Sequence, residues 1–136
     1  MPESPSISVE PMGVAESVGL GLWGISWRIQ NLGASDLGIS ETWLPHGRFR
    51  AGRQSMEPPL RVEPGQEVTL TFEVACQEEP RTIVENAFLI LIADWQGEPW
   101  RLLARLAIDW SEAAEPQPRT ELITSQRVGF AAAEPT

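Results

Sequence analysis

Two segments of the chain alternate apolar and polar side chains with a period of two. Residues 68–76 and 100–110 both carry apolar side chains at their even positions. These are Val68, Leu70, Phe72, Val74 and Cys76 in the first segment, and Trp100, Leu102, Ala104, Leu106, Ile108 and Trp110 in the second. Successive side chains of a strand point to opposite faces of the sheet, so each segment predicts a strand with one face in a core. The chain is therefore expected to be all-β.

Other segments fit the same scheme less regularly. Residues 20–30 alternate strongly and place Trp23 and Trp27 on one face, which we assign to the core. Residues 37–43 predict a strand, but Glu41 interrupts its apolar face and favours a place at a sheet edge.

The remaining segments are harder to assign. Residues 87–95 are apolar on both faces, as in a central strand covered on two sides or in a buried helix. Residues 7–9 predict a short first strand that ends at Glu10 and Pro11, and residues 45–60 are expected to be irregular because they are rich in glycine and proline.

About seven short strands separated by turns predict an immunoglobulin-like antiparallel β-sandwich over residues 7–110. Residues 1–6 form a flexible N-terminus in this interpretation, and residues 111–136 form a Pro/Ala/Glu-rich tail that begins with a linker. The tail contains an apolar island that predicts one more strand at 121–130. That strand either pairs with the domain's own sheet or adds to a sheet of another chain.

A family resemblance rests on two turns and the strands beside them. Residues 27–33 read Trp-Arg-Ile-Gln-Asn-Leu-Gly, and residues 62–68 read Val-Glu-Pro-Gly-Gln-Glu-Val ahead of an alternating strand. This pattern resembles bacterial immunoglobulin-like modules of the adhesion-related, cell-surface type over residues 20–110. The resemblance implies binding to a partner or a spacer role rather than catalysis. The cysteine pair that crosses between sheets in antibody domains is missing here.

Charge and composition limit the partners. The formal net charge is −9, and all ten basic residues are arginine. An acidic surface disfavours nucleic acids and anionic membranes, because both bind through neutralised phosphate. With no recognisable signal sequence and no apolar run long enough to span a bilayer, the expected location is the cytoplasm.

The sharpest candidate contact is an arginine cluster in an otherwise acidic chain. It consists of Arg48, Arg50 and Arg53 around Phe49, and it could dock an acidic or phosphorylated partner. The alternative is a solvated loop whose arginines neutralise nearby glutamates.

The apolar island of the tail is the second candidate contact with a partner protein. Its members are Leu122, Ile123, Val128 and Phe130. A homo-oligomer is compatible with either contact.

Two alternatives compete with protein binding. A carbohydrate-binding accessory module would stack sugars on Trp43, Trp95 and Trp100. An enzyme would have to use the single His46 with the single Cys76, because no other nucleophile motif is present. No metal-ligand spacing and no cofactor fingerprint occur. The sequence therefore favours a non-catalytic protein-interaction or assembly module without cofactor or metal.

Overall fold

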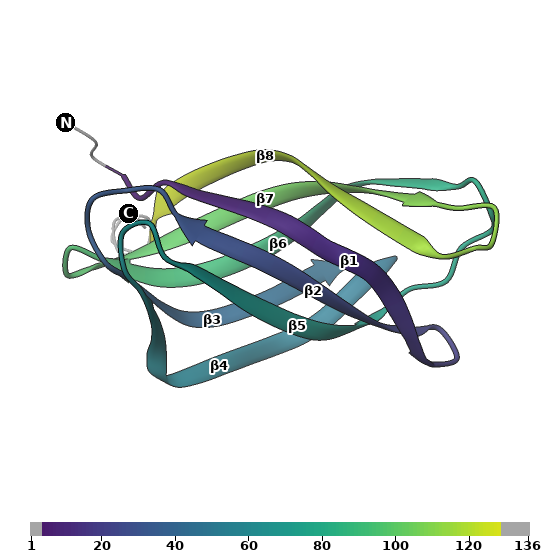
Figure 1. Ribbon diagram of the computed structural model, residues 1–136, viewed down its shortest axis with the longest axis horizontal. Helices are drawn as coiled ribbons and strands as arrows, with labels where there is room; N and C mark the ends of the chain where they lie inside the picture. The colour runs from purple at the N-terminus through teal and green to yellow at the C-terminus, as the bar shows by residue number, and fades with distance from the viewer. Residues whose placement is uncertain (1–3, 129–136) are drawn as a thin grey trace, which may run out of the picture.

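The structure is a computed structural model that describes residues 4–128 as one antiparallel sheet of eight strands (Figure 1). The strands are β1 (Ile7–Gly19), β2 (Leu22–Asn31), β3 (Leu37–His46), β4 (Phe49–Val62), β5 (Glu67–Ala75), β6 (Ile83–Trp95), β7 (Glu98–Trp110) and β8 (Pro116–Arg127). Their order in the sheet is β1-β2-β5-β4-β3-β6-β7-β8. The sheet curls until β1 and β8 face each other across a groove of about 510 Å³, so that it forms a nearly closed barrel.

The predicted immunoglobulin-like sandwich is therefore wrong, although the all-β class is right. A period of two shows that one face of each strand is buried. It does not show whether the buried faces belong to two stacked sheets or to one sheet that curls on itself.

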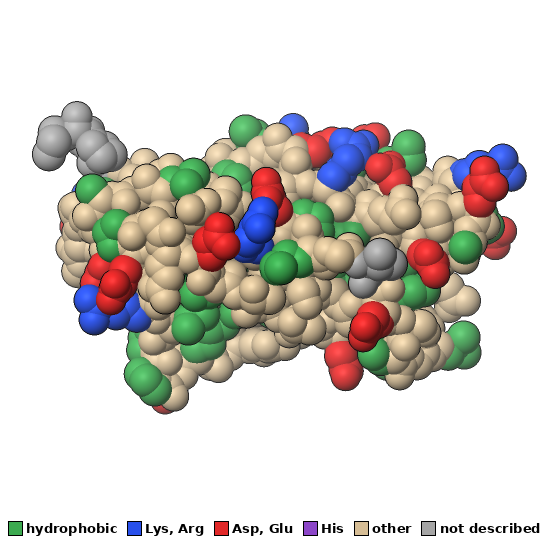
Figure 2. Space-filling model, viewed as in Figure 1, with side chains coloured by type: hydrophobic (Ala, Val, Ile, Leu, Met, Phe, Trp, Pro, Cys, Tyr) green, Lys and Arg blue, Asp and Glu red, His purple; other side chains and the backbone are tan. Residues whose placement is uncertain are grey.

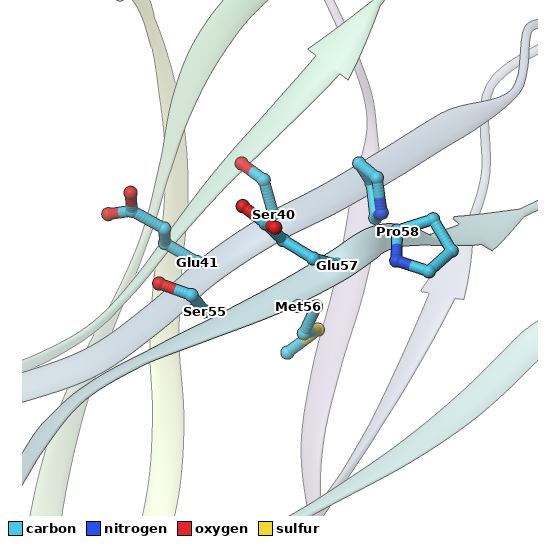
Figure 3. Close-up of a pocket in the computed structure, with 7 residues that line it drawn as sticks. Ser40, Glu41, Ser55, Met56, Glu57 and Pro58 are labelled. Atoms are coloured by element: carbon cyan, nitrogen blue, oxygen red, sulfur yellow. The ribbon is translucent and has the colours of Figure 1, made fainter.

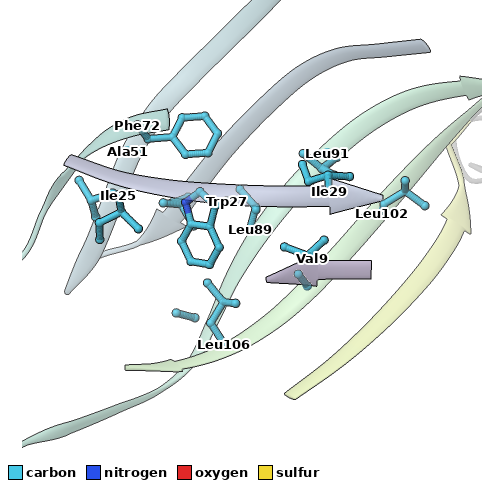
Figure 4. Close-up of a cluster of buried hydrophobic side chains, with 14 of the residues drawn as sticks. Val9, Ile25, Trp27, Ile29, Ala51, Phe72, Leu89, Leu91, Leu102 and Leu106 are labelled. Atoms are coloured by element: carbon cyan, nitrogen blue, oxygen red, sulfur yellow. The ribbon is translucent and has the colours of Figure 1, made fainter. Parts of the chain in front are cut away.

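The interior is filled by the side chains that the alternation places on one face (Figure 4). Trp27 and Leu106 have no exposed surface, and Phe72 and Leu102 are almost as deeply buried. The core assignment of Trp27 is confirmed, whereas Trp23 is only partly buried against the core. The even positions of β7 point inward as predicted.

Strand β3 is not an edge strand, because β4 and β6 pair on its two sides. A β-bulge at Ser40 shifts the alternation in both ladders. Leu37 and Ile39 point inward before the bulge, and Leu44 does so after it. Glu41 lies on the outside for this reason. The prediction that Glu41 interrupts the apolar face is therefore wrong.

The segment predicted as irregular is mostly strand β4. Its pairing with β3 passes from Ile39↔Leu60 to Glu41↔Ser55, so residues 56–59 lie opposite Ser40 alone. This wide bulge contains Pro58 and Pro59, which have no N–H to donate to a ladder.

Three other features of the strands differ from the predictions. Strand β1 continues through Pro11 to Gly19, which an edge strand permits. In β6, Leu89 and Leu91 are buried while the alternate side chains are partly exposed, so only one face of this strand lies inside. The linker predicted at the start of the tail, residues 115–118, is wrong, because residues 116–118 are the first residues of β8 and pair with β7 of the same chain.

Candidate functional site

The arginine cluster is largely neutralised by glutamates of the same chain. Arg48 Nε and Nη2 lie 3.0 and 2.5 Å from the two carboxylate oxygens of Glu78. This hydrogen-bonded pair lowers the pKa of the Glu78 carboxyl. Arg53 Nε lies 3.3 Å from Glu41 Oε1, and its guanidinium lies 4.0 Å from the centre of the Trp43 ring.

The other two members of the cluster differ in exposure. Phe49 is completely buried and offers no surface to a partner, whereas Arg50 is exposed. On the face seen in Figure 2, basic side chains lie next to acidic ones. Arg28 and Glu10 form such a pair at 2.7 Å. The structure thus brings Arg48 and Arg53 to acids of the same chain and does not gather the three arginines into a free positive patch.

Two of the four residues of the apolar island, Leu122 and Ile123, belong to β8. Leu122 is 48% exposed, while Ile123 packs against the core. Val128 is partly exposed, and Phe130 lies outside the described residues.

The tryptophans proposed for sugar stacking offer little free ring surface. Trp95 and Trp100 are each 5% exposed, and their rings pack edge to face at 5.8 Å. One face of Trp43 is covered by Arg53. A sugar needs an open aromatic face, which these three positions do not present together.

Cys76 and His46 do not form a nucleophile–base pair. The Cys76 thiol is buried, and burial together with the nearby Glu78 raises its pKa to about 12, so it stays protonated at neutral pH. His46 Nδ1 accepts a hydrogen bond from the Arg48 backbone N–H at 3.0 Å. Within residues 4–128, no cluster of three or more metal-ligating side chains is present. The same residues contain no helix long and apolar enough to cross a membrane.

The distinctive feature of the sheet is an opening between β4 and β5. These strands are neighbours, yet Arg50↔Ala75 is their single paired position in the described part of the chain. Figure 1 shows β4 swinging away from β5 toward the left of the view. Among the described residues, the facing edges of β4 and β5 thus lack a ladder partner along most of their length, as do the outer edges of the terminal strands β1 and β8. An unpaired strand edge can receive an added strand.

The register between β2 and β5 shows which backbone groups are free. Gly21 O accepts from Cys76 N, and Asn31 N donates to Gln66 O, both at 3.0 Å. The ladder between these two bonds has no bulge, so even-numbered residues of β5 bond to β2. The odd-numbered residues direct their N–H and C=O groups away from β2. These free residues are Glu67, Thr69, Thr71 and Glu73.

Apolar side chains beside the opening are incompletely covered. Val68 and Leu70 of β5 point inward but are only partly buried, whereas Phe72 further along the strand is 2% exposed. On β4, Met56 and Leu60 are likewise partly buried. The missing ladder and the uncovered apolar side chains coincide along the same stretch.

The β4 side of the opening is shaped by its bulge. A hollow of about 570 Å³ lies between this bulge and β3, and Figure 3 shows Ser40 and Glu41 of β3 beside Ser55 and Glu57 of β4 in its lining. The Ser40 hydroxyl donates to Ile92 O at 3.2 Å. With prolines at 58 and 59, this edge offers fewer donors than the edge of β5.

Comparisons with known proteins add little. No protein-family model matches the sequence, and no curated protein matches it, so the resemblance to immunoglobulin-like modules has no support there. One solved structure, described as "X-ray structure of Northeast Structural Genomics Consortium target SoR45", is 12% identical and aligns over 92% of this chain and 87% of its own. Its TM-score of 0.33 is too low to support an argument about fold or function.

Proposed function

We propose that this protein is a non-catalytic protein-binding module that receives an extended segment of a partner protein on the open edge of β5. The observation that supports the proposal is the row of free backbone groups at Thr69, Thr71 and their odd-numbered neighbours. An added strand would satisfy these groups and would cover Val68 and Leu70, so hydrogen bonds and apolar contacts would form together.

Main-chain pairing on β5 takes the place of the side-chain contacts expected from the sequence. Affinity would come from main-chain pairing on β5, and neither the arginine cluster nor the tryptophans take part. We also propose a cytoplasmic location. This location is compatible with Cys76, which is free and buried. Disulfides are typical of oxidising compartments, and the binding mode proposed here uses none.

A proline substitution on the edge tests this function. Thr71 directs its N–H away from β2, so Thr71→Pro removes an open-edge donor and leaves the β2 ladder intact. Thr71→Val is the matched control, because it keeps the donor and removes the hydroxyl that contacts Ser26 at 2.8 Å.

Tagged wild-type protein and both variants would be used to capture partners from the native extract. We expect a partner bound to wild type and Thr71→Val but lost with Thr71→Pro. Hydrogen exchange of the captured complex should then show new protection at Thr69 and Thr71. Equal capture by all three proteins, with no change in exchange on β5, would rule out strand addition at this edge.

A further inference from the structure

The open edge of β5 also carries information about the segment that it receives. Building on the function proposed above, we propose that this segment is a basic β-strand with apolar side chains at alternate positions. It would carry Lys or Arg opposite Glu67 and Glu73. Three observations support this: the limits of the free edge, the direction of the neighbouring side chains, and the charges that flank them.

The free edge has definite limits. Arg50 of β4 occupies the place beside Ala75, so an added strand cannot extend past that position. At the other end, Gln66 N donates to Glu63 O at 2.9 Å inside the turn. The receiving stretch therefore runs from Glu67 to Glu73.

The pleat of β5 fixes where the side chains of the added strand point. Residues directly opposite each other in a ladder lie on the same face of the sheet. Positions opposite Val68 and Leu70 would point into the incompletely covered interior and favour apolar side chains. Positions opposite Thr69 and Thr71 would point outward beside exposed hydroxyl groups and tolerate small polar side chains.

The ends of the stretch are acidic. Glu67 and Glu73 are both exposed on the outer face, and neither takes part in an ion pair within 4.0 Å in the described chain. Glu67 lies within electrostatic reach of Arg28, but Arg28 is held by Glu10 at 2.7 Å. Opposite charges directly across a ladder stabilise it, and like charges destabilise it. The net charge of −9 acts in the same direction.

The experiment compares two fluorescein-labelled peptides by anisotropy at physiological ionic strength. The basic peptide is Lys-Val-Thr-Val-Thr-Val-Lys, and the acidic peptide is Glu-Val-Thr-Val-Thr-Val-Glu, both with the same neutral flanking residues. Their symmetric sequences place the same charges opposite Glu67 and Glu73 in either strand direction. The two opposite-charge pairs should make the basic peptide bind about tenfold more tightly than the acidic one.

Charge-reversed variants separate the local effect from the overall charge. Glu67→Lys combined with Glu73→Lys should reverse the preference toward the acidic peptide. The control is Glu85→Lys combined with Glu112→Lys, which changes the net charge equally at exposed positions on β6 and between β7 and β8, away from the edge. The control should keep the preference for the basic peptide.

The outcomes distinguish this inference from the function on which it depends. If both peptides bind equally and Thr71→Pro abolishes both, strand addition is supported and the basic partner is ruled out. If the control reverses the preference as fully as the edge variant does, the local charges do not select the partner. If neither peptide binds at millimolar concentration, both proposals fail.

Discussion

The β6–β7 and β4–β5 hairpins both turn through a glycine with positive φ, but their loops have two residues (96–97) and four residues (63–66), and their pairing differs. Gln96 and Gly97 adopt positive φ angles of 53° and 80° in the first turn, and Gly65 has φ of 81° in the second. The first hairpin pairs from Trp95↔Glu98 to Ile83↔Asp109 with one irregularity. The second pairs only at its far end. A tight turn is therefore not sufficient to join the strands that it connects.

The difference begins at Asn31, which binds the second turn from outside the hairpin. Its backbone accepts from Gly65 N at 2.8 Å and donates to Gln66 O. Its side-chain Nδ2 donates to Ser35 O and Val62 O at 2.8 and 2.9 Å. These bonds direct the start of β5 toward β2, while Val62 stays paired with Leu37 of β3.

The sequence of β4 completes the separation. Residues 52–55 are exposed on both faces, and Pro58 and Pro59 cannot donate hydrogen bonds. By contrast, β6 and β7 place inward-facing apolar side chains along nearly their whole length. The comparison indicates that pairing follows the buried face of both strands as well as the turn between them.

The largest effect should come from a charge placed in the fully paired hairpin. Leu106→Glu would bury an unpaired carboxylate at a site with no exposed surface, so we expect the domain to unfold. Leu70→Glu, beside the opening, should leave a folded protein because that carboxylate can reach water. Urea denaturation measures both variants, and equal losses of stability would show that the β5 edge is as closed as β7.

Amide hydrogen exchange should resolve the edge residue by residue. In β5, we expect slow exchange at the even positions Leu70 and Phe72 and fast exchange at Thr69 and Thr71. In β6, neighbouring amides such as those of Leu89 and Ile90 should all be protected, because β3 and β7 pair on its two sides. Uniform protection along β5 would contradict the open edge.

Loss of the Asn31 side chain should destabilise the domain by about 2–4 kcal/mol, since Asn31→Ala leaves buried carbonyl groups without donors. The free energy of unfolding from urea denaturation measures this loss. Asn31→Ser serves as a milder control that keeps one polar group. If Asn31→Ala unfolds at the wild-type urea concentration, the Asn31 side chain does not hold the turn.

The smallest effect concerns the Arg48–Glu78 pair. Because the pair lowers the pKa of Glu78 below its ordinary value of 4.5, its stabilisation is present above that value. It is lost as the pH falls through the lowered pKa of the folded state. Arg48→Ala should therefore reduce stability slightly at pH 7 and not at pH 2, as measured by thermal unfolding across pH. A variant equally destabilised at both values would indicate lost packing instead of lost charge pairing.

The sequence was sufficient to predict a strand and its inward face wherever the alternation of apolar and polar residues was unbroken. Residues 20–30, 68–76 and 100–110 correspond to β2, β5 and β7 with the correct inward face. The sequence was insufficient to predict the inward face beyond a β-bulge, as at Ser40. One extra residue there moves the following side chains to the other face of the sheet. Strand order was also beyond reach, since β2 and β5 pair across a long separation that local periodicity does not encode.

The sequence does not predict the open edge of β5, because residue type does not show directly whether a backbone N–H or C=O group is paired. An indirect signal was available in β4. Residues 52–55 lack an apolar alternation, and Pro58 and Pro59 follow them, which indicates a strand unable to support a neighbour on its second side. An irregular composition in β4 therefore points to an unpaired edge on β5, the strand that follows it.

The acidic ends of the β5 edge also determine what happens when the protein is concentrated. Two copies that paired edge to edge and antiparallel, centred on Leu70, would bond through their odd-numbered residues and use the whole free stretch. That arrangement would place Glu67 of each copy directly opposite Glu73 of the other, at both ends of the shared ladder. The repulsion opposes fibril-like stacking of this chain, so the open edge of β5 is protected against self-association.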